Sequence, residues 1–146
     1  MPIFKYSKLV RDNIARWHVE NGHTPKVLHL TGDKLVEALV SKLHEEADEV
    51  GAALSRDELT EEISDVQQVL NDLCAAAGIS LTDVEAVRAK KTGRKGGFQQ
   101  GVYIESILIP NESDEWAQYC RRSPEKYPEL TETVDVAAVG ADCGTN

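Results

Sequence analysis

Apolar residues recur every three or four positions along most of the first two thirds of the chain, which is the pattern of amphipathic helices. This pattern predicts four helices, over residues 7–21, 33–54, 56–77 and 80–92. A further short helix is expected over residues 115–121. Residues 102–109 are rich in β-branched side chains and predict a strand, which is expected to pair with residues 26–30.

Capping residues mark where the helices begin and end. Ser7 is the expected N-cap of the first helix, which ends at residues 21–22, an Asn-Gly pair. Ser55 and Glu58 form a capping-box pattern after a very short turn, in which the two side chains satisfy free backbone amides. The two long helices are therefore expected to form an antiparallel hairpin. A basic, glycine-containing turn at residues 93–97 is expected to break the fourth helix.

The expected fold is all-α: a four-helix-bundle-like domain built on the long hairpin, with minor β strands, and completed by oligomerisation. This domain is expected over residues 1–110, followed by a C-terminal extension over residues 111–146. The extension begins with the short helix, and residues 137–146 are expected to form a mobile tail. Two long helices with wide apolar faces cannot cover themselves, so we expect a homodimer or a dimer of dimers.

The charge and hydropathy of the chain argue against nucleic-acid and membrane partners. The chain has 146 residues, with 16 basic and 25 acidic side chains and a net charge of -9, which argues against a nucleic-acid polymer. No apolar run approaches the roughly 20 residues of a membrane span, and the N-terminus lacks the apolar core of a signal peptide. We therefore expect a cytoplasmic protein with no membrane partner. An anionic substrate stays compatible with this charge if a cation lies between the two.

The most informative feature is a set of carboxylates mirrored across the hairpin. Glu46 and Glu49 lie three residues apart on the first long helix, so they share one of its faces. Glu62 and Asp65 have the same spacing on the second. Glu49 and Glu62 are equally far from the turn near Ser55, and so are the other two carboxylates. The four groups therefore meet in two rungs, one helical turn apart, if the two faces look at each other.

A helical wheel places Glu46 and Glu62 inside the apolar sectors of their helices, with the other two carboxylates at the sector edges. Carboxylates gathered beside an apolar face lose hydration and repel one another, which raises their pKa and costs stability. A divalent cation removes this cost, and Mg²⁺, with Mn²⁺ as a substitute, suits an all-oxygen site. The alternative is a solvated acidic helix face, which is the commoner case. Asp72, seven residues beyond Asp65, is a weaker candidate ligand.

This acidic spacing resembles the signature of the all-α nucleoside triphosphate pyrophosphohydrolases, the MazG-like group. The matching residues are Glu45-Glu46-x-x-Glu49, followed after 12 residues by Glu62-x-x-Asp65. Two further stretches resemble a phosphoribosyl-ATP pyrophosphohydrolase-like subgroup. They are YSKLVRDNI at residues 6–14 and KTGRKGGF at residues 91–98, where the family commonly shows Lys, two residues, then Arg-Gly-Gly-Phe. Lys95 here stands between Arg94 and the glycines.

The resemblance implies Mg²⁺-dependent hydrolysis of a nucleoside triphosphate between its α and β phosphates, giving a monophosphate and pyrophosphate. The residues that match the family's metal ligands are Glu46, Glu49, Glu62 and Asp65. Glu45 or Glu49 is the candidate general base, as a carboxylate not fully used in ligation. Two alternatives stay open: hydrolysis of phosphoribosyl-ATP in histidine biosynthesis, and a non-catalytic helical oligomer whose acidic cluster binds a cation.

Two basic groups are the candidate phosphate-binding residues. Lys91 and Arg94, with Lys95 as a weaker candidate, lie at the end of the fourth helix and in the glycine turn. Lys8 and Arg11 lie three residues apart near the N-terminus. Cations are also favoured at helix C-termini and on solvated surfaces, so each group has a purely structural alternative.

Overall fold

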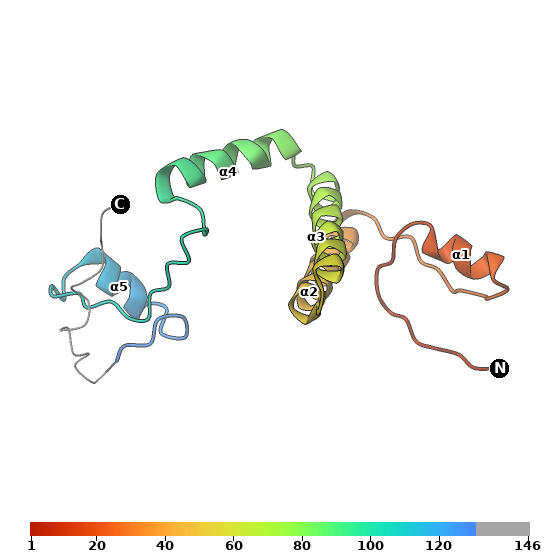
Figure 1. Cartoon of the computed structure of the whole chain (residues 1–146), viewed down its shortest axis with the longest axis horizontal. Coiled ribbons are helices and arrows are strands. Elements are labelled where there is room, and N and C mark those ends of the chain that lie inside the picture. The colour runs from red at the N-terminus through yellow and green to blue at the C-terminus, as the bar shows by residue number, and fades with distance from the viewer. Residues whose placement is uncertain (131–146) are drawn as a thin grey trace. The chain divides into compact units, whose positions relative to one another are not determined.

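The computed structural model describes residues 1–130, and all the regular secondary structure in this range is helical. The helices are α1 (Ile14–Glu20), α2 (Gly32–Ala52), α3 (Arg56–Ala76), α4 (Leu81–Lys95) and α5 (Glu115–Arg121), as Figure 1 shows. The chain divides into two units, Met1–Gly97 and Phe98–Asn146. The predicted all-α class is confirmed. No helix within residues 1–130 is long and apolar enough to cross a membrane.

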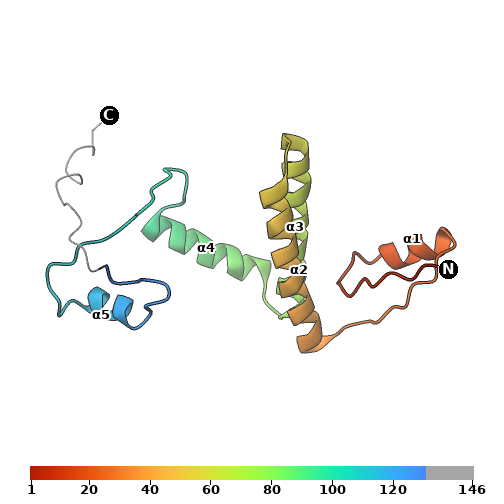
Figure 2. The same ribbon diagram turned by 90° about the horizontal axis from the view of Figure 1, so that it is seen from below.

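The long helices α2 and α3 form the predicted antiparallel hairpin and lie side by side along their lengths (Figures 1 and 2). Each has 21 residues, so the hairpin is about 30 Å long at 1.5 Å per residue. Leu39 of α2 and Val69 of α3 are the apolar residues buried in this unit's described part. Their burial draws the apolar stripes of the two helices together and fixes which faces look at each other.

The turn between α2 and α3 carries the capping box that the sequence predicts. The Ser55 side chain accepts a hydrogen bond of 3.1 Å from the backbone N–H of Glu58. The Glu58 carboxylate in turn accepts one of 2.8 Å from the backbone N–H of Leu54, one residue before the cap. Both bonds satisfy amides that the start of α3 would otherwise leave free. They therefore fix the point at which the chain reverses.

The first helix is shorter than predicted. It begins at Ile14 rather than near Ser7, which has a φ of +46°, outside the extended region that an N-cap adopts. The segment before α1 instead folds back, and the Tyr6 ring meets the His18 ring edge-on at 5.8 Å. The predicted end is confirmed, because Asn21 is the C-cap of α1 and Gly22 follows with a φ of +77°.

The fourth helix begins at its predicted cap, where the Ser80 side chain accepts from the backbone N–H groups of Thr82 and Asp83. The helix ends within the predicted turn at residues 93–97, but it continues three residues beyond the predicted end at Thr92, to Lys95, so Gly93 lies inside it. A single glycine lowers helix stability without ending the helix. Termination occurs instead at Gly96, whose φ of +79° lies in the left-handed region that glycine adopts without strain.

The predicted β strands are absent from the described part of the chain, and this expectation was wrong. Residues 26–30 and 102–109 belong to different units and form no ladder with each other. Most side chains of the second segment, such as Val102 and Ile104, are exposed. β-branched residues favour strands chiefly by packing against neighbouring strands, and residues 1–130 contain no strand that could be such a neighbour.

The hairpin is not closed into a bundle by α1 and α4. Within residues 1–97, α2 and α3 are the helices that pack extensively against each other. Leu59, Ile63 and Leu70 of α3 therefore stay exposed, as do Leu81 and Val84 of α4. The four-helix arrangement is thus present as a sequence of helices and not as a packed core of one chain.

The second unit contains α5, at its predicted position, and a cluster of aromatic rings. Trp116 stacks on Tyr119 with ring centroids 5.0 Å apart, and Tyr127 lies 5.9 Å from Tyr119. Ala117, on the same helix, is buried. The tail predicted for residues 137–146 lies outside the described residues.

The capping box gives a first testable prediction. Ser55→Ala removes the acceptor for the Glu58 amide and should lower the free energy of unfolding by about 1 kcal/mol, measured by urea denaturation. Ser64→Ala is the matched control, because the Ser64 hydroxyl only donates to the carbonyl of Glu61 within the same helix. Equal losses in the two variants would contradict a special role for the turn.

Candidate metal centre and active site

Three carboxylates converge where the faces of α2 and α3 meet. Glu46 and Glu49 of α2 and Glu62 of α3 each offer one oxygen, and these oxygens all lie within 4.8 Å of one another. The hairpin register produces this convergence, because Glu49 and Glu62 are equally far from the turn. Glu46 joins them because it lies three residues before Glu49 and so shares its helix face.

Glu46 is the most buried member of this group, with only 3% of its surface exposed. One of its oxygens, Oε1, lies 2.5 Å from the ammonium nitrogen of Lys42, one turn earlier on α2. The other oxygen, Oε2, is buried and has no hydrogen-bond partner. A buried carboxylate oxygen without a partner is costly, so the site lacks a positively charged group at this oxygen. A divalent cation that favours oxygen ligands would neutralise this oxygen and suits a donor set made only of carboxylates.

Glu49 shows the repulsion within the group. Close approach of the Glu46 carboxylate is the largest cause that raises the pKa of Glu49, followed by desolvation and by the negative charge of Glu62. Lys42 opposes this effect only weakly. A proton or a cation held between these carboxylates therefore stabilises the folded hairpin.

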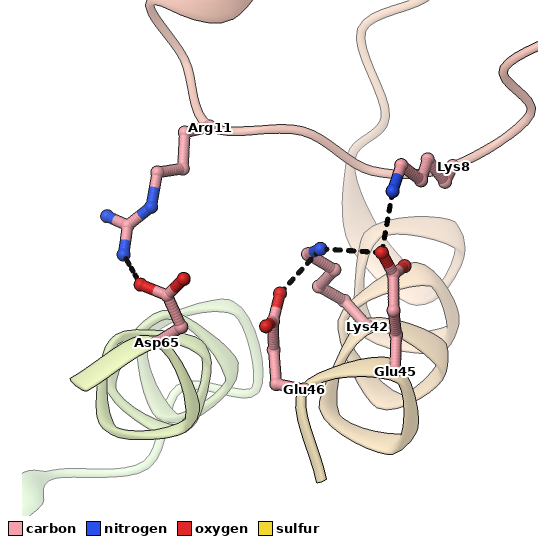
Figure 3. A network of polar contacts seen from close by, with 6 residues as sticks. All are labelled: Lys8, Arg11, Lys42, Glu45, Glu46 and Asp65. Atoms are coloured by element: carbon pink, nitrogen blue, oxygen red, sulfur yellow. Dashed lines mark hydrogen bonds and ion pairs between the residues drawn. The ribbon is translucent and has the colours of Figure 1, made fainter. Parts of the chain in front are cut away.

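The fourth mirrored carboxylate, Asp65 of α3, lies outside this group of three. It forms an ion pair with the Arg11 guanidinium, which belongs to the N-terminal segment before α1 (Figure 3). The weaker candidate Asp72 is exposed and accepts hydrogen bonds of 3.1 Å from Gln68 on its own helix. The structure thus unites three of the predicted ligands and gives Asp65 a different partner.

Glu45, which is not one of the three converging carboxylates, pairs with two lysines, Lys8 and Lys42. Its Oε1 lies 2.7 Å from the Lys8 ammonium and 3.0 Å from that of Lys42. Hydrogen bonds from Lys8 and then Lys42 hold the pKa of Glu45 below its usual value. The same pairing raises the pKa of Lys8. Figure 3 shows the N-terminal segment passing over both helices, with Lys8 directed to α2 and Arg11 to α3.

Lys42 is the residue of this site that the sequence analysis missed. Burial opposes its charged form, but hydrogen bonds to Glu46 and Glu45 outweigh burial and raise the pKa of Lys42. A signal was present, because Lys42 precedes these glutamates by four and three residues, the spacings at which helix neighbours pair.

The other predicted phosphate-binding group lies on α4. Lys91, Arg94 and Lys95 occupy its last turns, where all three are exposed. Among the described residues, none of them pairs with a carboxylate of the hairpin. The structure therefore brings Lys8 and Arg11 to the carboxylates and leaves the α4 cations apart from them.

A comparison with models of known protein families shows the family to which the chain belongs. The family model for phosphoribosyl-ATP pyrophosphohydrolase matches residues 18–91, about half of the chain, including all of α2 and α3. The chain belongs to this family. The phosphoribosyl-ATP pyrophosphohydrolase family is part of the MazG-like all-α superfamily, which confirms the resemblance seen in the sequence. No curated protein and no solved structure matches the chain.

Membership makes the protein a nucleotide pyrophosphohydrolase, a hydrolase that acts on a phosphoric anhydride bond. This favours the enzymatic interpretation over a non-catalytic cation-binding oligomer. The matched segment contains the three converging carboxylates and Lys42, whereas Lys8 and Arg11 precede it.

The raised pKa of Glu49 predicts a pH-dependent stability. Its folded-state pKa lies above the ordinary 4.5, so its contribution to stability is greatest below that pH and is lost as pH rises through the folded pKa. Glu49→Gln should therefore raise the metal-free melting temperature at neutral pH, and the gain should vanish below about pH 4.5. Asp48→Asn, an exposed neighbour, should show no such trend in calorimetry. A pH-independent gain would contradict the carboxylate repulsion.

Proposed function

We propose that the protein is a Mg²⁺-dependent pyrophosphohydrolase that cleaves a nucleoside triphosphate between its α and β phosphates. Two observations on the same side chains carry this proposal: the convergence of Glu46, Glu49 and Glu62, and the buried Glu46 oxygen that has no partner. Family membership supports anhydride hydrolysis on a nucleotide. The carboxylate group supports a hard divalent cation, because such cations favour oxygen ligands.

Glu46, Glu49 and Glu62 would hold the metal, and Asp65 would join them after release by Arg11. Mn²⁺ is the expected substitute for Mg²⁺. When bound, such a cation neutralises polyphosphate charge and lowers the pKa of water. It also lets a chain with a net charge of -9 accept a polyanionic substrate.

The two candidate bases differ in electrostatic environment. The pKa of Glu49 is raised by its carboxylate neighbours, whereas that of Glu45 is lowered by Lys8 and Lys42. A carboxylate with a higher pKa accepts a proton more readily. We therefore assign the general base to Glu49, which would act through the carboxylate oxygen that it does not use to hold the metal. We assign to Glu45 the role of orienting Lys8 and Lys42 beside the reaction centre.

Four cations are proposed to bind the phosphates. Lys8 and Arg11 lie nearest, since they already pair with carboxylates of the hairpin. Both side chains are about half exposed, so they can exchange a carboxylate for a phosphate oxygen without a large desolvation cost. Lys91 and Arg94 of α4 are proposed to bind the outer phosphates. Lys95, next to Arg94, is a weaker candidate in addition to these four.

A second substrate is favoured by a specific finding. The matching family is described by its action on phosphoribosyl-ATP, in which the same α–β anhydride bond is cleaved. Both substrates give pyrophosphate, so the carboxylate group serves either reaction. Product analysis with each nucleotide in parallel distinguishes them.

The catalytic proposal is tested by replacing neighbouring acids on α3. Glu62→Gln removes a proposed ligand and should reduce kcat/KM by more than the roughly 100-fold that loss of an outer-shell partner costs. Glu61→Gln is the matched control, because Glu61 is exposed and lies outside the carboxylate group. Pyrophosphate release with Mg²⁺ is the measurement, and circular dichroism checks that both variants stay helical. Near wild-type activity of Glu62→Gln would refute the site.

We further propose that the active unit is a homodimer or a dimer of dimers. The exposed α3 side chains Leu59, Ile63 and Leu70 lie at spacings of four and seven residues, which places them on one stripe. Within the described residues no helix of the same chain packs extensively over them. A second hairpin would bury this stripe, and the α4 of the second copy would supply the cations that the single chain holds apart from the carboxylates.

Light scattering tests this assembly. Leu70→Glu places a charge in the apolar stripe and should convert the oligomer to a monomer of 16.1 kDa at micromolar concentration. Gln68→Glu adds the same charge to an exposed position on the opposite face of α3, about 160° around the helix from Leu70, and should leave the oligomer intact. A wild-type protein that is monomeric and fully active would overturn the proposal.

A further inference from the structure

Lys42 occupies a special position among the cations of the site. It is the one that pairs with Glu46, at 2.5 Å, and its side chain is only 17% exposed. Lys8 and Arg11 are carried by the N-terminal segment, with side chains 46% and 57% exposed, and can leave with that segment. Lys42 is anchored on α2 itself, so its ammonium leaves Glu46 only by a change of side-chain rotamer.

The pairing solves a problem of the metal-free protein. A carboxylate as deeply buried as Glu46 strongly destabilises the fold unless a positive charge lies beside it. Lys42 supplies this charge at Oε1, while Oε2 stays unpartnered. Lys42 thus neutralises only one oxygen of the Glu46 carboxylate. It forms no ion pair with Glu49 or Glu62, the other two members of the group.

A divalent cation and the Lys42 ammonium compete for the same group. A cation ligated by Glu46, Glu49 and Glu62 would stand within a few ångströms of an ammonium that already touches Glu46, and like charges at that separation repel. Lysine has a flexible four-carbon stem, and Glu45 offers it a second acceptor at 3.0 Å. The ammonium can therefore withdraw from Glu46 and keep an ion pair.

We propose that Lys42 is the resident counter-ion of Glu46, which holds the buried carboxylate in place before metal binds and is displaced toward Glu45 when a divalent cation enters. Lys42 is then a positioning residue that lowers the apparent metal affinity, since metal must first displace it. The inference rests on the proposed metal centre and adds a competitor within the chain.

Calorimetric titration with Mg²⁺ tests the competition. Lys42→Met should bind Mg²⁺ several-fold more tightly than the wild-type protein, because the metal no longer displaces an ammonium. Its metal-free melting temperature should fall below that of the wild type, and saturating Mg²⁺ should close the gap. Lys34→Met, on the exposed first turn of α2, should change neither quantity. Equal or weaker Mg²⁺ binding by Lys42→Met would overturn the proposal.

A second measurement uses the wild-type chain and does not depend on the folding of a variant. Acylation of lysine amines, mapped by mass spectrometry, should find Lys42 protected without metal and more reactive with Mg²⁺, while Lys34 stays constant. Protection of Lys42 that persists with bound Mg²⁺ would refute the displacement and leave the metal centre standing. Failure of the wild type to bind Mg²⁺ at all would overturn the metal centre and this proposal together.

Discussion

The register of the α2–α3 hairpin is the constraint on which the site depends. The Ser55–Glu58 capping box fixes where the chain reverses, and burial of Leu39 and Val69 fixes which faces meet. A slip of one residue would move a carboxylate by about 1.5 Å along its helix and turn it by about 100°. Glu46 would then leave the interface between the helices, and the oxygens that lie within 4.8 Å would separate.

The same register brings stability and chemistry into conflict. Packing two apolar stripes places Glu46 among them, where a charge is expensive, and places Glu49 and Glu62 close enough to repel it. Lys42 offsets part of this cost at Glu46, while Lys8 and Arg11 pair with the flanking carboxylates of Glu45 and Asp65. A local departure from good packing rules of this kind is typical of functional sites in natural proteins. The carboxylates are thus retained at the hairpin interface despite their cost.

The parts that could be predicted from the sequence depend on neighbours along the chain. The hairpin, its cap and α5 follow from short-range spacing, and the convergence of Glu49 with Glu62 follows from counting outward from the turn. The ion pairs of Lys8 with Glu45 and of Arg11 with Asp65 join residues 37 and 54 positions apart, which no local pattern encodes. The segment that carries Lys8 and Arg11 was expected to be helical but is irregular up to residue 13. The strand predicted over residues 102–109 is absent. A strand also depends on a partner distant in the sequence, which a local pattern of β-branched residues does not reveal.

The ion pairs of the site differ in how far water reaches them, and this difference makes the site respond unevenly to ionic strength. Salt screens charges that face solvent over about 8 Å at physiological concentration, but it screens buried pairs much less. The half-exposed Lys8 and Arg11 therefore loosen their hold on the hairpin as salt rises, while Lys42 and Glu46 stay paired. At high salt the Lys42–Glu46 pair therefore keeps its geometry, whereas the N-terminal segment that carries Lys8 and Arg11 is released from the hairpin.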